Sequence, residues 1–151
     1  MLNLHREPVQ ESWLDAYGHL SEAYYLVPFS NASWAYQDHF DIGVTYFEKT
    51  GGALYTLETH LRYLKEVRFP ATLEVGTLIL AHDAKRLHFA HVMHVDGTEC
   101  ATFECIGIHF DSRAGRTAPF PDHVQAALTG AALAPADWPD WVGRRCSLVK
   151  K

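Results

Sequence analysis

Apolar and polar residues follow two different periods along this chain, and the change of period divides it into elements. Between Ser21 and Phe40 the apolar residues recur at spacings of mostly three and four, which predicts a long helix with one apolar stripe. Pro28 lies early in this stretch, and a helix tolerates proline only in its first turn. We therefore expect the regular helix to begin near Val27 or to follow a short irregular turn.

Runs rich in leucine, aromatic and β-branched residues predict the strands. One short strand is expected before the helix and four longer ones after it, over residues 5–14, 53–67, 72–81, 85–95 and 98–110. The dipeptide Asp96-Gly97 between the last two strands is a strong hairpin signal. The remaining chain predicts a loop, a short helix and an irregular covering segment, over residues 111–121, 122–131 and 131–151.

This order of elements predicts an α+β fold in which an antiparallel sheet wraps around one long central helix. Consecutive strands joined by short turns are antiparallel, and one apolar helix can cover one face of a sheet. In the two central strands both alternating sets of residues include Leu, Phe, Ile or Val. We therefore expect the second face to extend across a subunit interface or to pack against another sheet. The length of 151 residues and the lack of internal repeats predict one domain over residues 1–151.

The balance of charges excludes several classes of partner. Thirteen Lys and Arg against eighteen Asp and Glu give a net charge of −5, so the chain has no general attraction to nucleic acid or to an anionic membrane. No apolar run approaches the ~20 residues of a membrane span, and the charged N-terminus lacks the apolar core of a secretory signal. The three cysteines are odd in number, which argues against a disulfide framework. We expect a cytoplasmic protein.

The stretch from Asp15 to His19, Asp-Ala-Tyr-Gly-His, lies between the first predicted strand and the helix. A helix N-terminus offers unsatisfied backbone N–H groups and the positive end of a dipole, which suit a polarised carbonyl. A carboxylate at this position is well placed to act on that carbonyl. The alternative is that Asp15 caps a turn and Gly18 supplies a positive φ. The motif by itself leaves both interpretations open.

The wider sequence resembles the hotdog-fold acyl-CoA thioesterases of the 4-hydroxybenzoyl-CoA thioesterase type, from about residue 9 to residue 111. The Asp-x-x-Gly-His signature of that family and an aromatic residue shortly after it fall at Asp15, Gly18, His19 and Tyr25. The runs YTLETHLRYLKEV, DAKRLHF and ATFE are most similar to the betainyl-CoA thioesterases of carnitine breakdown. The resemblance implies a hotdog fold and the hydrolysis of a short acyl-CoA, such as betainyl-CoA, to the free acid and CoA.

Two positions depart from the family pattern. Many members carry two Asp residues in this turn, whereas here Trp13 and Leu14 precede a single Asp15. Ser21-Glu22 replaces the more usual pair of asparagines. These differences bear on the acyl specificity more than on the reaction.

The resemblance implies a role for each residue of the turn. Asp15 is the catalytic carboxylate, either as a nucleophile on the thioester carbon or as a general base for water, and the sequence does not separate the two. The backbone amides near Glu22 and Ala23 are the expected donors to the thioester oxygen. Gly18 permits the turn. His19 holds the turn or the leaving group, with a purely structural role as the alternative.

Further residues are candidates for substrate binding. Lys85 and Arg86 open a strand that in related thioesterases contacts the phosphates of coenzyme A, and Arg62 is a third candidate. The alternative is a solvated strand end. Glu58 and Glu104 lie mid-strand among apolar residues, so each is either paired structurally or lines the acyl pocket, where it suits a cationic acyl group.

No metal or cofactor is expected. His88, His91 and His94 are spaced by three, but in a strand His91 points away from the other two, and the usual zinc spacings are missing. Because sites in the resembling family lie between subunits, we expect a homodimer or homotetramer. Two alternatives remain open, a non-catalytic module that binds acyl-CoA and a hydratase or dehydratase of the same fold.

Overall fold

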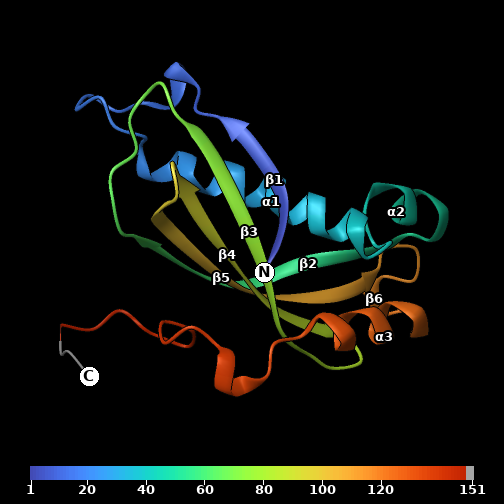
Figure 1. Cartoon of the computed structure of the whole chain (residues 1–151). Helices are drawn as coiled ribbons and strands as arrows, with labels where there is room; N and C mark the ends of the chain where they lie inside the picture. Colours follow the sequence, from blue (N-terminus) through green and yellow to red (C-terminus); the bar gives the residue numbers. More distant parts are fainter. Residues whose placement is uncertain (149–151) are drawn as a thin grey trace.

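An antiparallel sheet curls around one long helix, and a second, shorter layer lies on the outer side of the sheet (Figure 1). The structure is a computed structural model and describes residues 1–148. Its strands are β1 (Leu2–Pro8), β2 (Gly52–Tyr63), β3 (Thr72–His82), β4 (Arg86–Val95), β5 (Thr98–Asp111) and β6 (Arg116–Thr117). Its helices are α1 (Leu26–His39), α2 (Val44–Thr50) and α3 (Asp122–Ala131), with short 3-10 turns at Glu11–Trp13, Glu22–Tyr25 and Pro135–Asp137. This is the predicted α+β arrangement.

The strands pair in the order β1-β3-β4-β5-β2, and β6 extends the far end of β5. Every pairing is antiparallel. Strands β3, β4 and β5 follow one another through short turns and occupy the middle of the sheet. Strand β2 forms one edge, next to β5, and strand β1 forms the other.

Several elements differ from those expected. The first strand ends at Pro8 instead of residue 14, because proline has no N–H to continue the ladder and the chain then turns into the 3-10 segment. Strand β2 ends at Tyr63 instead of residue 67, since the N–H groups of Leu64 and Lys65 both converge on the carbonyl of Cys100. Helix α2 was not expected; its seven residues are too few to show a helical period.

Both expectations for the start of the long helix are met. A 3-10 turn over Glu22–Tyr25 comes first, and α1 then begins at Leu26, so that Pro28 lies in its first turn. The buried stripe of α1 is narrower than the apolar pattern, with Phe29, Ala32 and Tyr36 inside and Trp34 half exposed.

The core lies between α1 and the concave face of the sheet. The ring of Phe29 stacks on Phe103 of β5, with 5.3 Å between centroids, and on His91 of β4, at 5.9 Å. His91 is fully buried. Its ring nitrogens lie 3.0 Å from Ser33 Oγ of α1 and 3.0 Å from Thr77 Oγ1 of β3. One imidazole therefore joins the helix to two strands.

The outer face of the sheet is covered in part by the chain's own C-terminal segment, residues 132–143, which we call the strap. Its Trp141 lies over a small apolar cluster made by outward-facing residues of β3 and β4, namely Leu78, Leu80, Ala90 and Val92. The strap is fixed at one end by the N–H of Leu133, which donates to Ile79 O at 2.9 Å. Its other end is fixed by Gly143 N–H, 2.9 Å from Glu104 Oε2.

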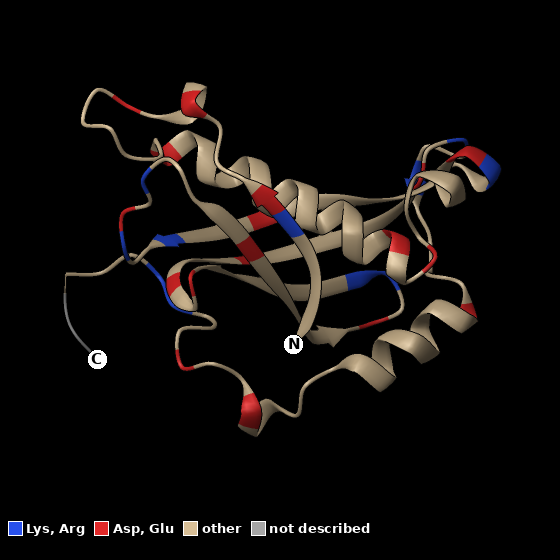
Figure 2. Ribbon diagram, turned by 45° about the horizontal axis from the view of Figure 1, so that its top comes forward, with Lys and Arg blue, Asp and Glu red and all other residues tan. Residues whose placement is uncertain are grey.

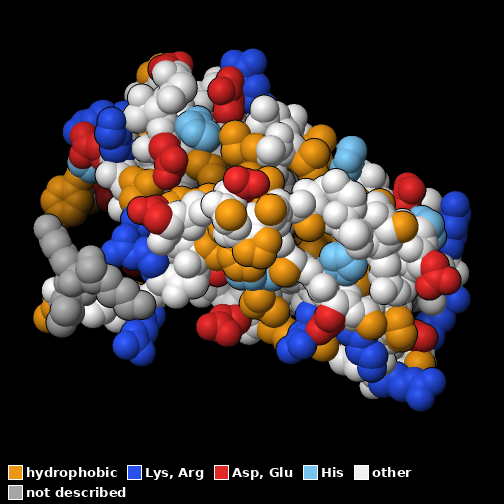
Figure 3. Space-filling view, turned by 60° about the horizontal axis from the view of Figure 1, so that its bottom comes forward, with side chains coloured by type: hydrophobic (Ala, Val, Ile, Leu, Met, Phe, Trp, Pro, Cys, Tyr) orange, Lys and Arg blue, Asp and Glu red, His pale blue; other side chains and the backbone are white. Residues whose placement is uncertain are grey.

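The strap explains part of the apolar pattern that predicted a subunit interface or a second sheet. Apolar residues on the outer sides of β3 and β4 pack against this irregular segment and not against another sheet. The view from below shows hydrophobic side chains gathered toward the middle of this side, with some acidic side chains among them and the basic ones mostly nearer its margins (Figure 3). Toward the β2 edge, Tyr55 and Leu57 stay about half exposed, at 45% and 57%.

Acidic and basic residues are interspersed over several elements of the molecule (Figure 2). Across residues 1–148, no helix is long and apolar enough to cross a membrane.

Candidate active site

The turn from Asp15 to His19 is held closed by its own hydrogen bonds. The N–H of Asp15 donates to His19 O at 2.8 Å, and the N–H of Gly18 donates to Asp15 O at 3.0 Å. Oδ1 of Asp15 accepts the N–H groups of Tyr17 at 2.8 Å and His19 at 3.2 Å. Gly18 has a φ of 76°, the left-handed conformation that glycine adopts without strain. The capping interpretation of the motif is therefore correct.

Capping uses one oxygen of the Asp15 carboxylate and leaves the other available. Within the part of the chain that the structure describes, Oδ2 of Asp15 accepts no hydrogen bond and no cation pairs with it, and the side chain is exposed. A carboxylate whose orientation is set by two backbone donors on one oxygen presents its second oxygen in a defined direction. Capping and chemistry are thus compatible at this residue.

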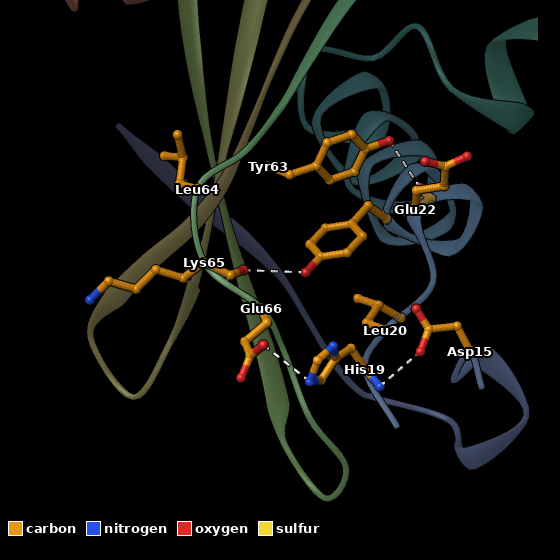
Figure 4. A pocket seen from close by; sticks show the side chains of 9 residues that line it. Asp15, His19, Leu20, Glu22, Tyr63, Leu64, Lys65 and Glu66 are labelled. Atoms are coloured by element: carbon orange, nitrogen blue, oxygen red, sulfur yellow. Dashed lines mark hydrogen bonds and ion pairs between the residues drawn. The ribbon is translucent and has the colours of Figure 1, made fainter. Parts of the chain in front are cut away.

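Asp15 borders a pocket of about 340 Å³ (Figure 4). Three segments line it: the turn, the start of the helical region and the chain that leaves β2. They contribute Asp15, His19, Leu20, Glu22, Tyr25, Tyr63, Leu64, Lys65 and Glu66. Four of the predicted site residues, Asp15, His19, Glu22 and Tyr25, therefore meet around one cavity.

The segment from Tyr63 to Glu66 belongs to this pocket and was missed by the sequence reasoning. The run RYLKEV contains these residues, but its composition predicts one continuous strand through residue 67. Because β2 stops at Tyr63, the residues that follow turn toward the motif. The N–H of Leu20 donates to Val67 O at 2.8 Å, which joins the two segments.

His19 connects the same two segments through its side chain. Its Nε2 lies 3.0 Å from Glu66 Oε2, and Glu66 Oε1 in turn lies 3.0 Å from Nη2 of Arg68. The backbones of His19 and Arg68 also form an antiparallel bridge. These contacts favour the structural role for His19, which keeps the turn beside the end of β2.

The start of the helical region supplies hydrogen-bond donors at the pocket. The 3-10 turn begins at Glu22, so the N–H groups of Glu22 and Ala23 precede the first possible bond within the turn. Ser21, at the position before the turn, makes no side-chain capping bond to them. Glu22 lines the pocket and Ala23 follows it in the chain; that their N–H groups donate to a thioester oxygen stays a prediction.

Lys85 and Arg86 do not reach this pocket in the same chain. Tyr63 at the pocket pairs with Ala101 of β5, and Ala101 pairs with Met93 of β4. Met93 is seven residues from Arg86 along β4, and seven strand residues span about 23 Å. The guanidinium of Arg86 is paired with Asp83, at 2.6 Å. Backbone N–H groups of Lys85 and Arg86, and then that guanidinium, lower the pKa of Asp83 to about 2.

The other predicted binding residues lie on the outer face of the sheet. Arg62 is adjacent in sequence to Tyr63, so its side chain points to the face opposite the helix. Glu58 and Glu104 border a different pocket of about 250 Å³, next to the strap. Glu104 is paired structurally there, with Oε1 at 2.7 Å from His88 Nε2. Glu58 is exposed near the β2 edge.

The three histidines of β4 do not converge on one point. His91 faces the core, whereas His88 and His94 lie on the other face, as the strand period predicts. Among residues 1–148, no three His, Cys, Asp or Glu side chains are grouped so that they could hold a metal ion.

Known proteins resemble the chain over most of its length. Residues 9–128 match the thioesterase-like superfamily. A betainyl-CoA thioesterase of Pseudomonas aeruginosa is 36% identical over 148 residues, which cover 95% of this chain and 93% of the relative. An L-carnitine dehydrogenase/betainyl-CoA thioesterase of Agrobacterium fabrum is 38% identical over 84% of this chain, and the match spans 26% of that longer protein.

Solved structures of other proteins also superpose on nearly the whole chain. A candidate thioesterase from Pseudomonas putida superposes with a TM-score of 0.83 at 33% identity, covering 99% of this chain and 97% of that one. A Staphylococcus aureus protein in complex with CoA superposes with a TM-score of 0.86 at 23% identity, covering 99% and 98%. These likenesses confirm the hotdog fold, and together with the sequence matches they show that the chain belongs to the thioesterase-like superfamily.

Proposed function

We propose that this protein hydrolyses a short acyl-CoA thioester to the free acid and CoA, that Asp15 is the catalytic carboxylate, and that betainyl-CoA is the preferred substrate. The observation that carries the proposal is the free Oδ2 of Asp15 at a pocket that Glu22, the first residue of the helical region, also lines. The relatives named for betainyl-CoA support the choice of acyl group.

The arrangement supports two routes with the same products. In the first, Oδ2 of Asp15 attacks the thioester carbon, the C–S bond breaks, CoA leaves as the thiolate and takes a proton, and water then hydrolyses the mixed anhydride. In the second, the carboxylate removes a proton from water, the resulting hydroxide attacks the carbonyl, and the proton passes to the leaving sulfur. In both, N–H donors at the start of the helical region stabilise the negative oxygen. The reactants are the thioester and water, with no further cofactor.

A second subunit belongs to the same proposal. Strand β2 is an edge strand of 12 residues whose outer edge pairs with no strand of residues 1–148, and its Leu57 is 57% exposed. Such an edge favours pairing with another chain. Since Lys85 and Arg86 lie far from the pocket of their own chain, we infer that they reach the CoA phosphates bound at a partner's pocket, in a homodimer or homotetramer.

The compartment is part of the proposal as well. Cys100, Cys105 and Cys146 are all free thiols, two of them buried. Free cysteines are typical of a reducing environment. We place the reaction in the cytoplasm.

The test is thiol release from a panel of acyl-CoAs, betainyl-CoA included, by the wild type, Asp15→Asn and Asp15→Ala. We expect turnover by the wild type and its loss in both variants. Glu48→Gln, an exposed carboxylate on α2 at the other end of the molecule, is the matched control and should keep full activity. Binding of acyl-CoA with no thiol release would favour the non-catalytic module. Full activity in both Asp15 variants would refute the role of the carboxylate.

A further inference from the structure

Two tyrosine rings form one wall of the pocket beside Asp15. Tyr25 and Tyr63 meet edge to face, with 5.1 Å between ring centroids and an interplanar angle of 83°. Tyr25 is 3% exposed and Tyr63 is 51% exposed, so the buried ring supports the open one. Tyr63 therefore presents aromatic surface to the cavity.

Hydrogen bonds to the backbone fix both rings. The hydroxyl of Tyr25 donates to Lys65 O at 3.3 Å, and the hydroxyl of Tyr63 donates to Glu22 O at 3.1 Å (Figure 4). Each bond joins the start of the helical region to the end of β2. The aromatic wall is thus in place before any ligand arrives.

The charge around this wall is negative. Of the three carboxylates that line the pocket, Glu66 is paired with His19 and Arg68, whereas Asp15 and Glu22 have no ion-pair partner among residues 1–148. The ammonium of Lys65 points away from the cavity (Figure 4). Partial burial and then the negative charge of Glu22 raise the pKa of Tyr63, so the carboxylate acts on this ring.

We propose that Tyr63, supported by Tyr25, and the carboxylate of Glu22 select acyl groups that carry a quaternary ammonium. The inference rests on the proposed function, because the acyl group occupies this wall only if the thioester lies beside Asp15. A quaternary ammonium donates no hydrogen bond, and it is attracted by an aromatic face within about 6 Å and by nearby carboxylates. In betainyl-CoA the cation is two bonds from the carbonyl carbon, so a thioester beside Asp15 would place its cation in the same pocket, which Tyr63 and Glu22 also line.

This assignment differs from the sequence-based expectation, in which Glu58 or Glu104 binds a cationic acyl group. Glu104 and Trp138 do lie near one another around His88, but on the outer face of the sheet. Their pocket is separated from Asp15 by the sheet itself. The acidic and aromatic groups that share the cavity with Asp15 are Glu22, Glu66, Tyr25 and Tyr63, and of the two glutamates Glu66 is already paired with His19 and Arg68.

The test compares betainyl-CoA with its neutral isostere 3,3-dimethylbutanoyl-CoA, in which a quaternary carbon replaces the nitrogen. Shape and length are matched, but the ammonium also makes the thioester carbon more electrophilic, so the ratio of the two kcat/KM values is divided by the ratio of the uncatalysed hydrolysis rates, and its change in each variant reports recognition of the charge. After this correction we expect the wild type to favour betainyl-CoA by about tenfold or more. Tyr63→Leu and Glu22→Gln should each lower this ratio about three- to tenfold, chiefly through the KM for betainyl-CoA. Tyr63→Phe keeps the ring and should keep the ratio within about twofold.

Tyr24→Leu is the matched control. Tyr24 is adjacent to Tyr25 and 38% exposed, but its ring stacks on Trp13 and does not line the pocket. This variant should leave the ratio unchanged.

The outcomes separate the two claims. Hydrolysis of neither ester by the wild type refutes the proposed function and the inference with it. Hydrolysis of both with equal kcat/KM, or an equal loss for both esters in Tyr63→Leu and Glu22→Gln, overturns the cation selection while hydrolysis stands. Glu22 is exposed, so its variant keeps the test decisive if Tyr63→Leu does not fold.

Discussion

Acidification from pH 7.5 to 5.0 should destabilise the fold by about 2 kcal/mol through one buried side chain, His91. Its burial lowers the pKa from 6.5 to about 3. The bonds around the ring agree with a neutral imidazole: because the hydroxyl of Ser33 donates to Phe29 O, Ser33 Oγ accepts from His91 Nε2–H, and the hydroxyl of Thr77 donates to Nδ1. The ring thus has no free site for a second proton.

The magnitude follows from the two pKa values. The unfolded chain takes up a proton near pH 6.5 and the folded protein near pH 3, so stability is complete above pH 6.5 and falls as the pH is lowered between these values. At pH 5.0 the unfolded state has gained RT ln(1 + 10^1.5), about 2 kcal/mol, whereas the folded state has gained almost nothing. The sign is the one expected for a histidine buried in its neutral form.

The assay is urea unfolding of the wild type and of Thr77→Val/His91→Leu at several pH values and one protein concentration. The double variant removes the titrating ring without leaving the Thr77 hydroxyl unpaired. The difference in unfolding free energy between the two proteins should shrink by about 2 kcal/mol from pH 7.5 to 5.0. Parallel pH profiles would refute the reasoning, as would an NMR titration in which the His91 ring of the folded protein protonates near pH 6.5.

Two further predictions concern the strap and the thiols. Trp141→Ala should lower the free energy of unfolding by about 3 kcal/mol, because Trp141 covers the outer apolar cluster. Trp34→Ala, on the exposed side of α1, is the control and should lower it by well under 1 kcal/mol. Equal losses in thermal or urea unfolding would contradict this prediction. In the native protein a thiol reagent should modify the exposed Cys146 rapidly and leave the buried Cys105 unmodified, because burial raises the pKa of the Cys105 thiol to about 12. Fast labelling of Cys105, measured by mass spectrometry, would contradict this prediction and show that the core opens.

Much of the fold could be predicted because its signals are local. The spacing of apolar residues located α1, and Asp96-Gly97 located the β4–β5 turn. The end of β2 was not predictable in this way: nothing in RYLKEV breaks a strand, and the ladder stops because two N–H groups share the carbonyl of Cys100. A covering segment from residue 131 was predicted, but not that its Trp141 packs on the outer face of β3 and β4, because a segment without period does not show where its side chains point.

The candidate site was predictable to the extent that it is contiguous in sequence. Asp15, His19, Glu22 and Tyr25 are close along the chain and meet in the structure. Tyr63 comes from a distant strand, and only the fold shows that its ring lies against Tyr25. The alternation of side chains along a strand predicts which residues share a face of the sheet, but it does not predict which pocket they border.

The central claim is that the carboxylate of Asp15 performs the chemistry, and the kcat for betainyl-CoA in Asp15→Asn tests it most directly. The amide can still accept the N–H groups of Tyr17 and His19, so the turn and the thermal unfolding midpoint should be kept. We predict a fall in kcat on the order of a thousandfold, with that midpoint unchanged. A folded Asp15→Asn protein that retains kcat within threefold of the wild type would contradict the account.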